Sequence, residues 1–169
     1  MPTVNQQQLG KALDRLCLAM GRALWEIQGC EQMFAKYYCV AFHLKGKTNL
    51  EQMIRELEVN FKHTSGELLR LFNRATNSRS ELSARLEAFI DERNWLAHRV
   101  RRLNFSQVLD AAAFPDLLQR INALKDEANS LILLFHNLLI DYFISLGVPR
   151  EEIEQSLEEE HQRLMARRD

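Results

Sequence analysis

The sequence predicts an all-α fold, an antiparallel bundle of about five helices with a long N-terminal helix. Leucine occurs 27 times, while valine, isoleucine and threonine together occur 18 times, a balance that favours helices over strands. No stretch alternates strictly between apolar and polar residues, as a half-buried strand would. Only six glycines and three prolines occur, and the prolines lie where segments are expected to begin or end.

The length and charge predict one helical domain over residues 1–169. A chain of 169 residues with 46% apolar residues can bury a substantial core without a metal or disulfide framework. The 22 basic and 23 acidic residues nearly cancel, so the total charge gives no reason to expect a protein that wraps duplex DNA. Any nucleic-acid site must therefore be a local patch.

The cysteines and the apolar segments favour a soluble protein of the cytoplasm. The chain has three cysteines, Cys17, Cys30 and Cys39, and no two of them form a C-x-x-C pair. An odd number of cysteines without such a pair is unlike a secreted disulfide framework. The first residues lack the basic and apolar regions of a secretory signal. The most apolar stretch, residues 131–146, is interrupted by polar side chains, so we expect a buried helix and no membrane span.

The first helix is expected from about Asn5 to Lys45, within a long helix or arm over residues 1–46. Its apolar residues recur near a 3.5-residue spacing: Leu9, Leu13, Leu16, Met20, Leu24, Ile27, Phe34, Tyr37, Ala41 and Leu44. Such a helix would be roughly 60 Å long. Part of it should therefore pack against another chain, or the helix should bend at Gly21 or Gly29. Gly46 is the expected stop.

Residues 48–147 are expected to form the core bundle, and its second helix begins at a capping box of Thr48 and Glu51. This helix should end between Asn73 and Asn77. Ser78 or Ser80 should cap the third helix, whose apolar positions extend from Leu82 to Leu103.

The chain after the third helix is expected to form two more helices. Residues 104–114 are a short connector, and Pro115-Asp116 opens a fourth helix that runs to Leu146 and stops at Gly147. A last amphipathic helix should occupy residues 149–169. Its acidic residues come first and its basic residues last, an order that the helix dipole favours. The charged side of this helix is therefore interpreted as a solvated face.

The third helix carries the one combination of residues that suggests chemistry, in the string Asp91-Glu-Arg-Asn-Trp-Leu-Ala-His-Arg99. Four residues separate Arg93 from His98, and Asn94 directly follows Arg93. Asn94 and His98 are i and i+4, so they share one helix face. Five residues turn an ideal helix by about 500°, so Arg93 and His98 should lie about 140° apart around the axis.

The segment R-N-x-L-A-H over residues 93–98 resembles the R-x(4–6)-H motif of the HEPN superfamily. These are all-helical proteins whose active members are metal-independent ribonucleases, commonly toxins or RNA-processing enzymes. The resemblance implies that Arg93, Asn94 and His98 are catalytic and that no metal or other cofactor is required. It also implies a homodimer in which the motif helices meet across a two-fold axis, so that two copies build one cleft.

The residue types suit such chemistry. An imidazole that titrates near neutral pH would let His98 accept a proton from a ribose 2′-hydroxyl or donate one to the leaving 5′-oxygen. The planar donor fork of Arg93 would stabilise the charge that develops on the phosphate, and Asn94 would orient the phosphate or His98. The product would be a 2′,3′-cyclic phosphate, and DNA would not react. Three following arginines are candidates for binding flanking RNA phosphates: Arg99, Arg101 and Arg102.

The alternative is a non-catalytic helical interaction or regulatory module, which binds an antitoxin or another regulatory protein through its long first helix and apolar fourth helix. Arg93 and His98 would then be a structural pair, and Trp95 would pack in the core or a dimer. A metal site is not expected, because the histidines lie far apart in the sequence and no ligand-like set of histidine and cysteine residues is formed. A nuclease requires its motif residues in an open cleft, whereas an adaptor places its largest exposed apolar patch elsewhere.

Overall fold

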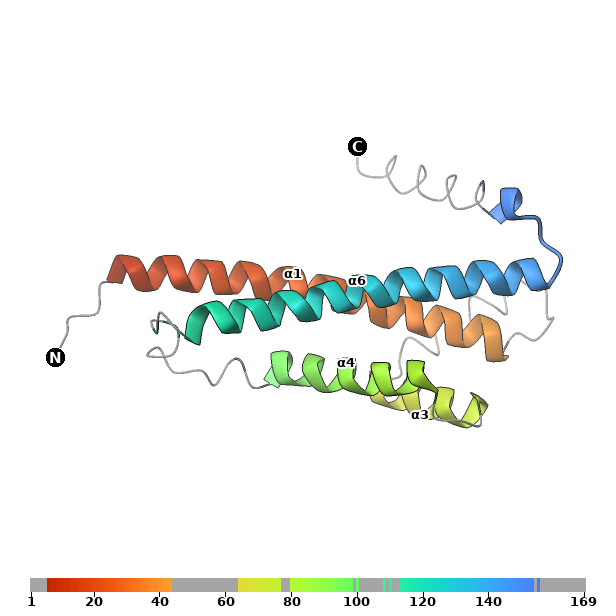
Figure 1. Ribbon diagram of the computed structural model, residues 1–169, viewed down its shortest axis with the longest axis horizontal. Coiled ribbons are helices and arrows are strands. Elements are labelled where there is room, and N and C mark those ends of the chain that lie inside the picture. Colours follow the sequence, from red (N-terminus) through yellow and green to blue (C-terminus); the bar gives the residue numbers. More distant parts are fainter. Residues whose placement is uncertain are drawn as a thin grey trace.

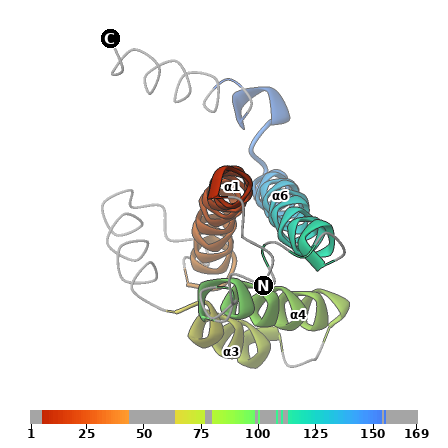
Figure 2. The same cartoon turned by 90° about the vertical axis from the view of Figure 1, so that its left-hand side faces the viewer.

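The all-α fold with a long N-terminal helix is confirmed by a computed structural model, which describes residues 6–43, 64–76, 80–98, 100, 108, 110, 113–153 and 155. These residues form α1 (Gln6–Tyr38), the π-helical segment η1 (Cys39–His43), α3 (Ser65–Thr76), α4 (Glu81–His98) and α6 (Ala113–Ser145), followed by a helical turn after Pro149 (Figure 1). The end-on view in Figure 2 shows two layers, with α1 and α6 side by side above α3 and α4.

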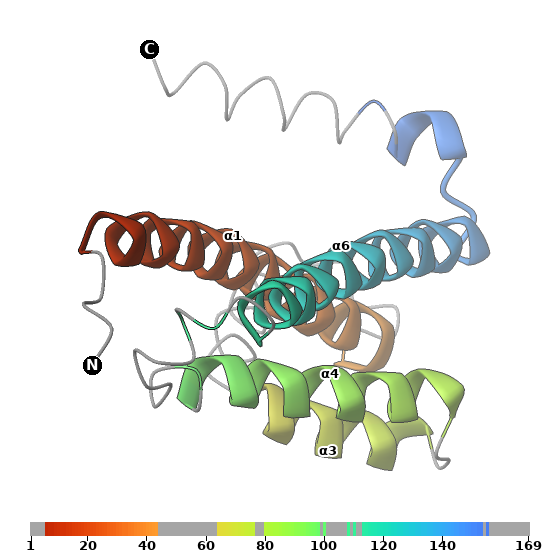
Figure 3. The same cartoon turned by 60° about the vertical axis from the view of Figure 1, so that its left-hand side comes forward.

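The two longest helices, α1 and α6, run side by side in the same direction (Figure 3). Near their starts, the Arg15 guanidinium lies 5.6 Å from the centroid of the Phe114 ring. Further along both helices, Phe34 stacks on Phe135 with ring centroids 5.1 Å apart. The antiparallel arrangement expected from the sequence does not hold for this pair, because α4 carries the chain back toward the end where α1 begins.

Helix α4 runs antiparallel to α6, and two bidentate ion pairs set the register between them. Arg85 on α4 donates to Glu127 on α6 at 2.6 and 3.1 Å. One heptad further along α4 the roles are exchanged, and Arg120 on α6 donates to Glu92 on α4 at 2.8 Å through each of two nitrogens.

A buried hydrogen bond joins the antiparallel hairpin of α3 and α4. Ser83 on α4 is fully buried, and its hydroxyl donates to Asn73 Oδ1 on α3 at 2.6 Å.

An aromatic cluster joins the two layers at the far end of α1. It comprises Phe34 and Tyr37 on α1, Phe42 on η1, Phe72 on α3 and Phe135 on α6, with neighbouring ring centroids 5.1 to 6.5 Å apart. Aromatic pairs in these geometries stabilise a core by about 0.5–1.5 kcal/mol each beyond the burial of their area. The cluster therefore anchors α3, and with it the α3–α4 hairpin, against the α1–α6 pair.

The first helix is uninterrupted at Gly21 and Gly29. It continues as an α-helix to Tyr38, and its hydrogen-bond pattern changes only at η1. Gly29 lies against α6, since a β-carbon there would be 3.3 Å from Ile132 Cδ1. The predicted end at Lys45 lies outside the described residues, as do the expected stop at Gly46 and the capping box of Thr48 and Glu51.

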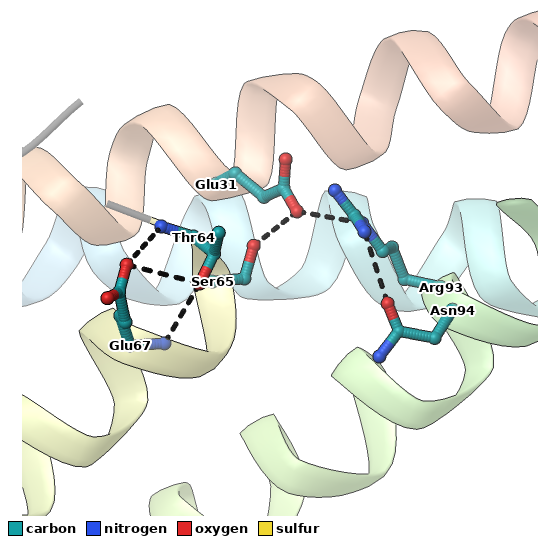
Figure 4. Close-up of polar contacts among 6 residues, drawn as sticks. All are labelled: Glu31, Thr64, Ser65, Glu67, Arg93 and Asn94. Atoms are coloured by element: carbon teal, nitrogen blue, oxygen red, sulfur yellow. Dashed lines mark hydrogen bonds and ion pairs between the residues drawn. The ribbon is translucent and has the colours of Figure 1, made fainter. Parts of the chain in front are cut away.

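The predicted second helix is not continuous as far as Asn73–Asn77, because Thr64 is not helical and α3 begins at Ser65. Its expected start at Thr48 lies outside the described residues. Thr64 is the N-cap of α3: Thr64 Oγ1 accepts from the Glu67 amide at 3.3 Å, and Glu67 Oε2 accepts from the Thr64 amide at 3.2 Å (Figure 4). This reciprocal capping box satisfies two backbone donors that would otherwise lack partners, so it starts a new helix. The end of α3 at Thr76 falls within the predicted range.

The start of the predicted third helix is confirmed at Ser80, whose Oγ accepts from the Ser83 amide at 3.2 Å. Helix α4 ends at His98, and Leu103, the last apolar position expected on it, lies outside the described residues. Helix α6 begins at Ala113, two residues before Pro115, because Asp110 Oδ1 accepts from the Ala113 amide at 3.3 Å.

The predicted glycine stop after α6 is confirmed, since Gly147 has a φ of 89° in the left-handed region that favours glycine.

Within the described part of the chain, α6 is the one helix long and apolar enough to cross a membrane by length and composition. A core helix of a soluble protein passes the same test. The inner side of α6 is fully buried at Ile121, Leu131 and Phe135.

Candidate functional site

The motif residues lie on the last two turns of α4, and Arg93 is directed toward α1. Arg93 Nε donates to Glu31 Oε1 at 3.0 Å, and Arg93 Nη1 donates to Asn94 Oδ1 at 3.1 Å. Ser65, at the start of α3, donates its hydroxyl to the same oxygen of Glu31. Figure 4 shows Glu31 between Ser65 and Arg93, so one carboxylate connects α1, α3 and α4.

The ion pair of Arg93 and Glu31 is partly shielded from water. The exposed fraction is 35% for the Arg93 side chain and 25% for the Glu31 side chain. A guanidinium carries five N–H donors, and the contacts to Glu31 and Asn94 engage Nε and Nη1. Arg93 therefore has a structural contact and still retains donors for a phosphate.

Asn94 and His98 are both exposed and line one hollow of about 600 Å³, as their i, i+4 spacing predicts. We call it the His98 hollow; its other lining residues are Asp91, Glu92, Trp95 and Arg120. Arg93 does not line it, in agreement with the angle of about 140° between positions 93 and 98. A single chain therefore brings Asn94 and His98 together and directs Arg93 to the neighbouring helix.

Arg120 and Glu92 are the residues of the His98 hollow that sequence reasoning missed. The Arg120 guanidinium lies 3.6 Å from the centroid of the Trp95 ring. The bidentate hydrogen bond between Glu92 and Arg120 lowers the pKa of Glu92 and raises the pKa of Arg120. No local sequence signal identifies this group, because Arg120 is 28 residues from Glu92 and on another helix.

A second hollow of about 300 Å³ lies between α4 and α6, bounded by the two Arg–Glu pairs. Its floor is apolar and consists of Ala88, Phe89, Ala123 and Leu124. We call it the alanine hollow. It contains none of the motif residues.

The predicted phosphate-binding residues Arg99, Arg101 and Arg102 lie outside the described residues. Among the residues that are described, no three histidine, cysteine, aspartate or glutamate side chains are grouped to hold a metal ion.

Comparison with known proteins gives no match: no family model matches the chain, and no curated protein or solved structure is significantly similar to it. What the site can do must therefore be derived from its own residues.

Proposed function

We propose that this protein is a metal-independent endoribonuclease of the HEPN type, with Arg93, Asn94 and His98 as its catalytic residues. The observation that carries the proposal is the exposure of Asn94 and His98 beside one open hollow of about 600 Å³. His98 is the last residue of α4, so its imidazole lies at a helix end accessible to a flexible RNA strand.

In the proposed reaction, His98 accepts the proton of a ribose 2′-hydroxyl as the 2′-oxygen attacks the adjacent phosphorus. The P–O bond to the 5′-oxygen breaks, and that oxygen leaves with the proton that the His98 imidazolium returns. The products are a 2′,3′-cyclic phosphate and a free 5′-hydroxyl. Asn94 orients the phosphate beside His98, and the guanidinium stabilises the extra negative charge in the transition state.

We infer that the guanidinium enters from a second copy of the chain. Arg93 contacts Glu31 and does not line the His98 hollow of its own chain. In a two-fold dimer, Arg93 of one copy would face His98 of the other, with the remaining donors of its fork toward the phosphate. Arg99, Arg101 and Arg102 would bind flanking phosphates.

The proposal includes a biological setting. A nuclease of this kind would act as a toxin or defence component in the cytoplasm, held inactive by a cognate antitoxin or regulatory protein. The free thiol of Cys17, which is exposed, suits a reducing compartment.

Mixing two inactive variants tests the proposal. Arg93→Ala and His98→Ala should each abolish cleavage of single-stranded RNA, and their mixture, after subunit exchange, should regain part of the wild-type rate. Arg74→Ala, at an exposed arginine on α3, is the matched control and should cleave at the wild-type rate. Full activity of either variant alone would refute the catalytic assignment, and failure of the mixture to recover would refute the composite cleft.

A second candidate function, the non-catalytic interaction module, is favoured by an exposed apolar pair on α1. Trp25 is 71% exposed and Leu18 is 56% exposed, and they lie seven residues apart on one side of the helix. Large apolar side chains that share an exposed face are typical of protein interfaces. Under this alternative, Trp25→Gln would weaken self-association measured by sedimentation, and the wild type would not cleave RNA.

A further inference from the structure

Arg120 occupies the wall of the His98 hollow in an orientation that three contacts determine. Trp95 covers one face of its guanidinium at 3.6 Å, and Nε and Nη2 each donate to Glu92 at 2.8 Å. Nη1 makes no hydrogen bond with any residue that the structure describes, and the side chain is 47% exposed. The accessible part of the guanidinium is therefore the face opposite Trp95 and the Nη1 edge.

We propose that Arg120 is a phosphate-binding residue for RNA, whose Nη1 edge holds a backbone phosphate beside Asn94 and His98. The inference rests on the proposed RNA function and adds to it a residue from α6 that the motif on α4 does not contain. Arg93 is held by Glu31, and among the arginines that the structure describes Arg120 is the one that lines the His98 hollow of the same chain.

The two supporting residues explain why this arginine suits the task. An arginine already oriented by a carboxylate and an aromatic ring loses little rotamer freedom when a phosphate binds. Glu92 also offsets part of the positive charge, and Asp91 lines the same hollow. The expected contribution is therefore that of one modest contact, a threefold to fivefold change in affinity, of the size measured for exposed ion pairs at about 1 kcal/mol or less.

Arg85 provides a matched control on the same pair of helices. It makes an equivalent bidentate contact with Glu127 at 2.6 and 3.1 Å, and a third hydrogen bond with Ser130 at 2.7 Å. It lines the alanine hollow and not the His98 hollow. Arg85→Ala therefore removes an ion pair between α4 and α6 without removing the proposed phosphate contact.

Binding of a fully 2′-O-methylated single-stranded oligonucleotide tests the proposal, because this probe lacks the attacking hydroxyl and reports binding without cleavage. Affinity is measured over a range of salt concentrations for the wild type, Arg120→Ala and Arg85→Ala. Arg120→Ala should weaken binding about threefold to fivefold and reduce the slope of log affinity against log salt by about 0.7, as the loss of one phosphate contact predicts. Arg85→Ala should change neither quantity.

Equal affinity and slope for Arg120→Ala and the wild type would overturn the assignment, and so would an equal loss in Arg85→Ala. Either result leaves the proposed ribonuclease function standing if His98-dependent cleavage is observed. Absence of oligonucleotide binding by the wild type would overturn both proposals. If Arg120→Ala does not fold, Arg120→Gln, which keeps a donor for Glu92, makes the same comparison.

Discussion

Arg93 and Glu31 are 62 residues apart in the sequence, yet Arg93 Nε lies 3.0 Å from Glu31 Oε1. The arginine of the motif on α4 is therefore held by the long first helix. Ser65 donates to the same carboxylate, so the position of this arginine depends on the packing of α1, α3 and α4 together. The long helix thus belongs to the support of the candidate site.

Replacement of Glu31 by glutamine should lower the free energy of unfolding by about 1 kcal/mol, because it removes the charge of a partly shielded ion pair. Urea unfolding measures the change. Glu87→Gln, at an exposed position on α4, is the control and should change stability by less than about 0.5 kcal/mol. Equal losses in the two variants would show that the contact with Arg93 contributes no stability.

Two glycines of α1 should respond differently to alanine. A β-carbon at Gly21 would have no neighbouring atom within 4 Å, whereas a β-carbon at Gly29 would lie 3.3 Å from Ile132 Cδ1. Gly21→Ala should therefore stabilise the protein by about 0.5–1 kcal/mol through helix propensity. Gly29→Ala should stabilise the protein clearly less than Gly21→Ala does, because the Ile132 side chain must move to make room for the new β-carbon. Thermal unfolding of both variants tests the close contact between Gly29 on α1 and Ile132 on α6, which an equal gain at Gly29 would contradict.

The secondary structure could be predicted from local patterns, and the pairing of helices could not. Ser80 and Gly147 were recognisable because a cap and a left-handed stop depend on neighbours within a few residues. The capping box of Thr64 and Glu67 is equally local, but a continuous apolar pattern obscured it. The parallel arrangement of α1 and α6 depends on the path of the whole chain, which no local spacing encodes.

The candidate site, like the fold, could be predicted from the sequence only in its local part. The shared face of Asn94 and His98 follows from helix geometry, and so does the divergence of Arg93. The partners of the site come from elsewhere in the chain: Glu31 from α1 and Arg120 from α6. Contacts between residues so distant in sequence require the tertiary structure.

Cys30 should resist alkylation in the folded protein, whereas Cys17 should react. Burial raises the pKa of the Cys30 thiol from 9.0 to about 12, and the negative charges of Glu31 and Glu127 add to the effect. The thiolate is the reactive form, so a buried and neutral thiol reacts slowly. Mass spectrometry after iodoacetamide treatment at mildly alkaline pH should find Cys17 modified first and Cys30 modified only after unfolding. Early modification of Cys30 would contradict its burial.

The same thiol predicts a pH dependence of stability. Because the pKa is higher in the folded state, the neutral thiol contributes stability that is fully present below pH 9.0 and is lost as the pH rises toward about 12. Cys30→Ala should reduce this alkaline loss relative to the wild type. Denaturant unfolding at neutral and alkaline pH measures the difference, and identical pH profiles for the two proteins would refute the prediction.

The most direct test of the ribonuclease proposal is incubation of the purified protein with single-stranded RNA and transfer RNA in the presence of a metal chelator. The products of the wild type and of His98→Ala are then compared by the chemistry of their 3′ ends. The proposal predicts wild-type cuts that end in a 2′,3′-cyclic phosphate and no cuts by the folded variant. Cleavage by His98→Ala at the wild-type rate, or no cleavage of either RNA by the wild type, would contradict it.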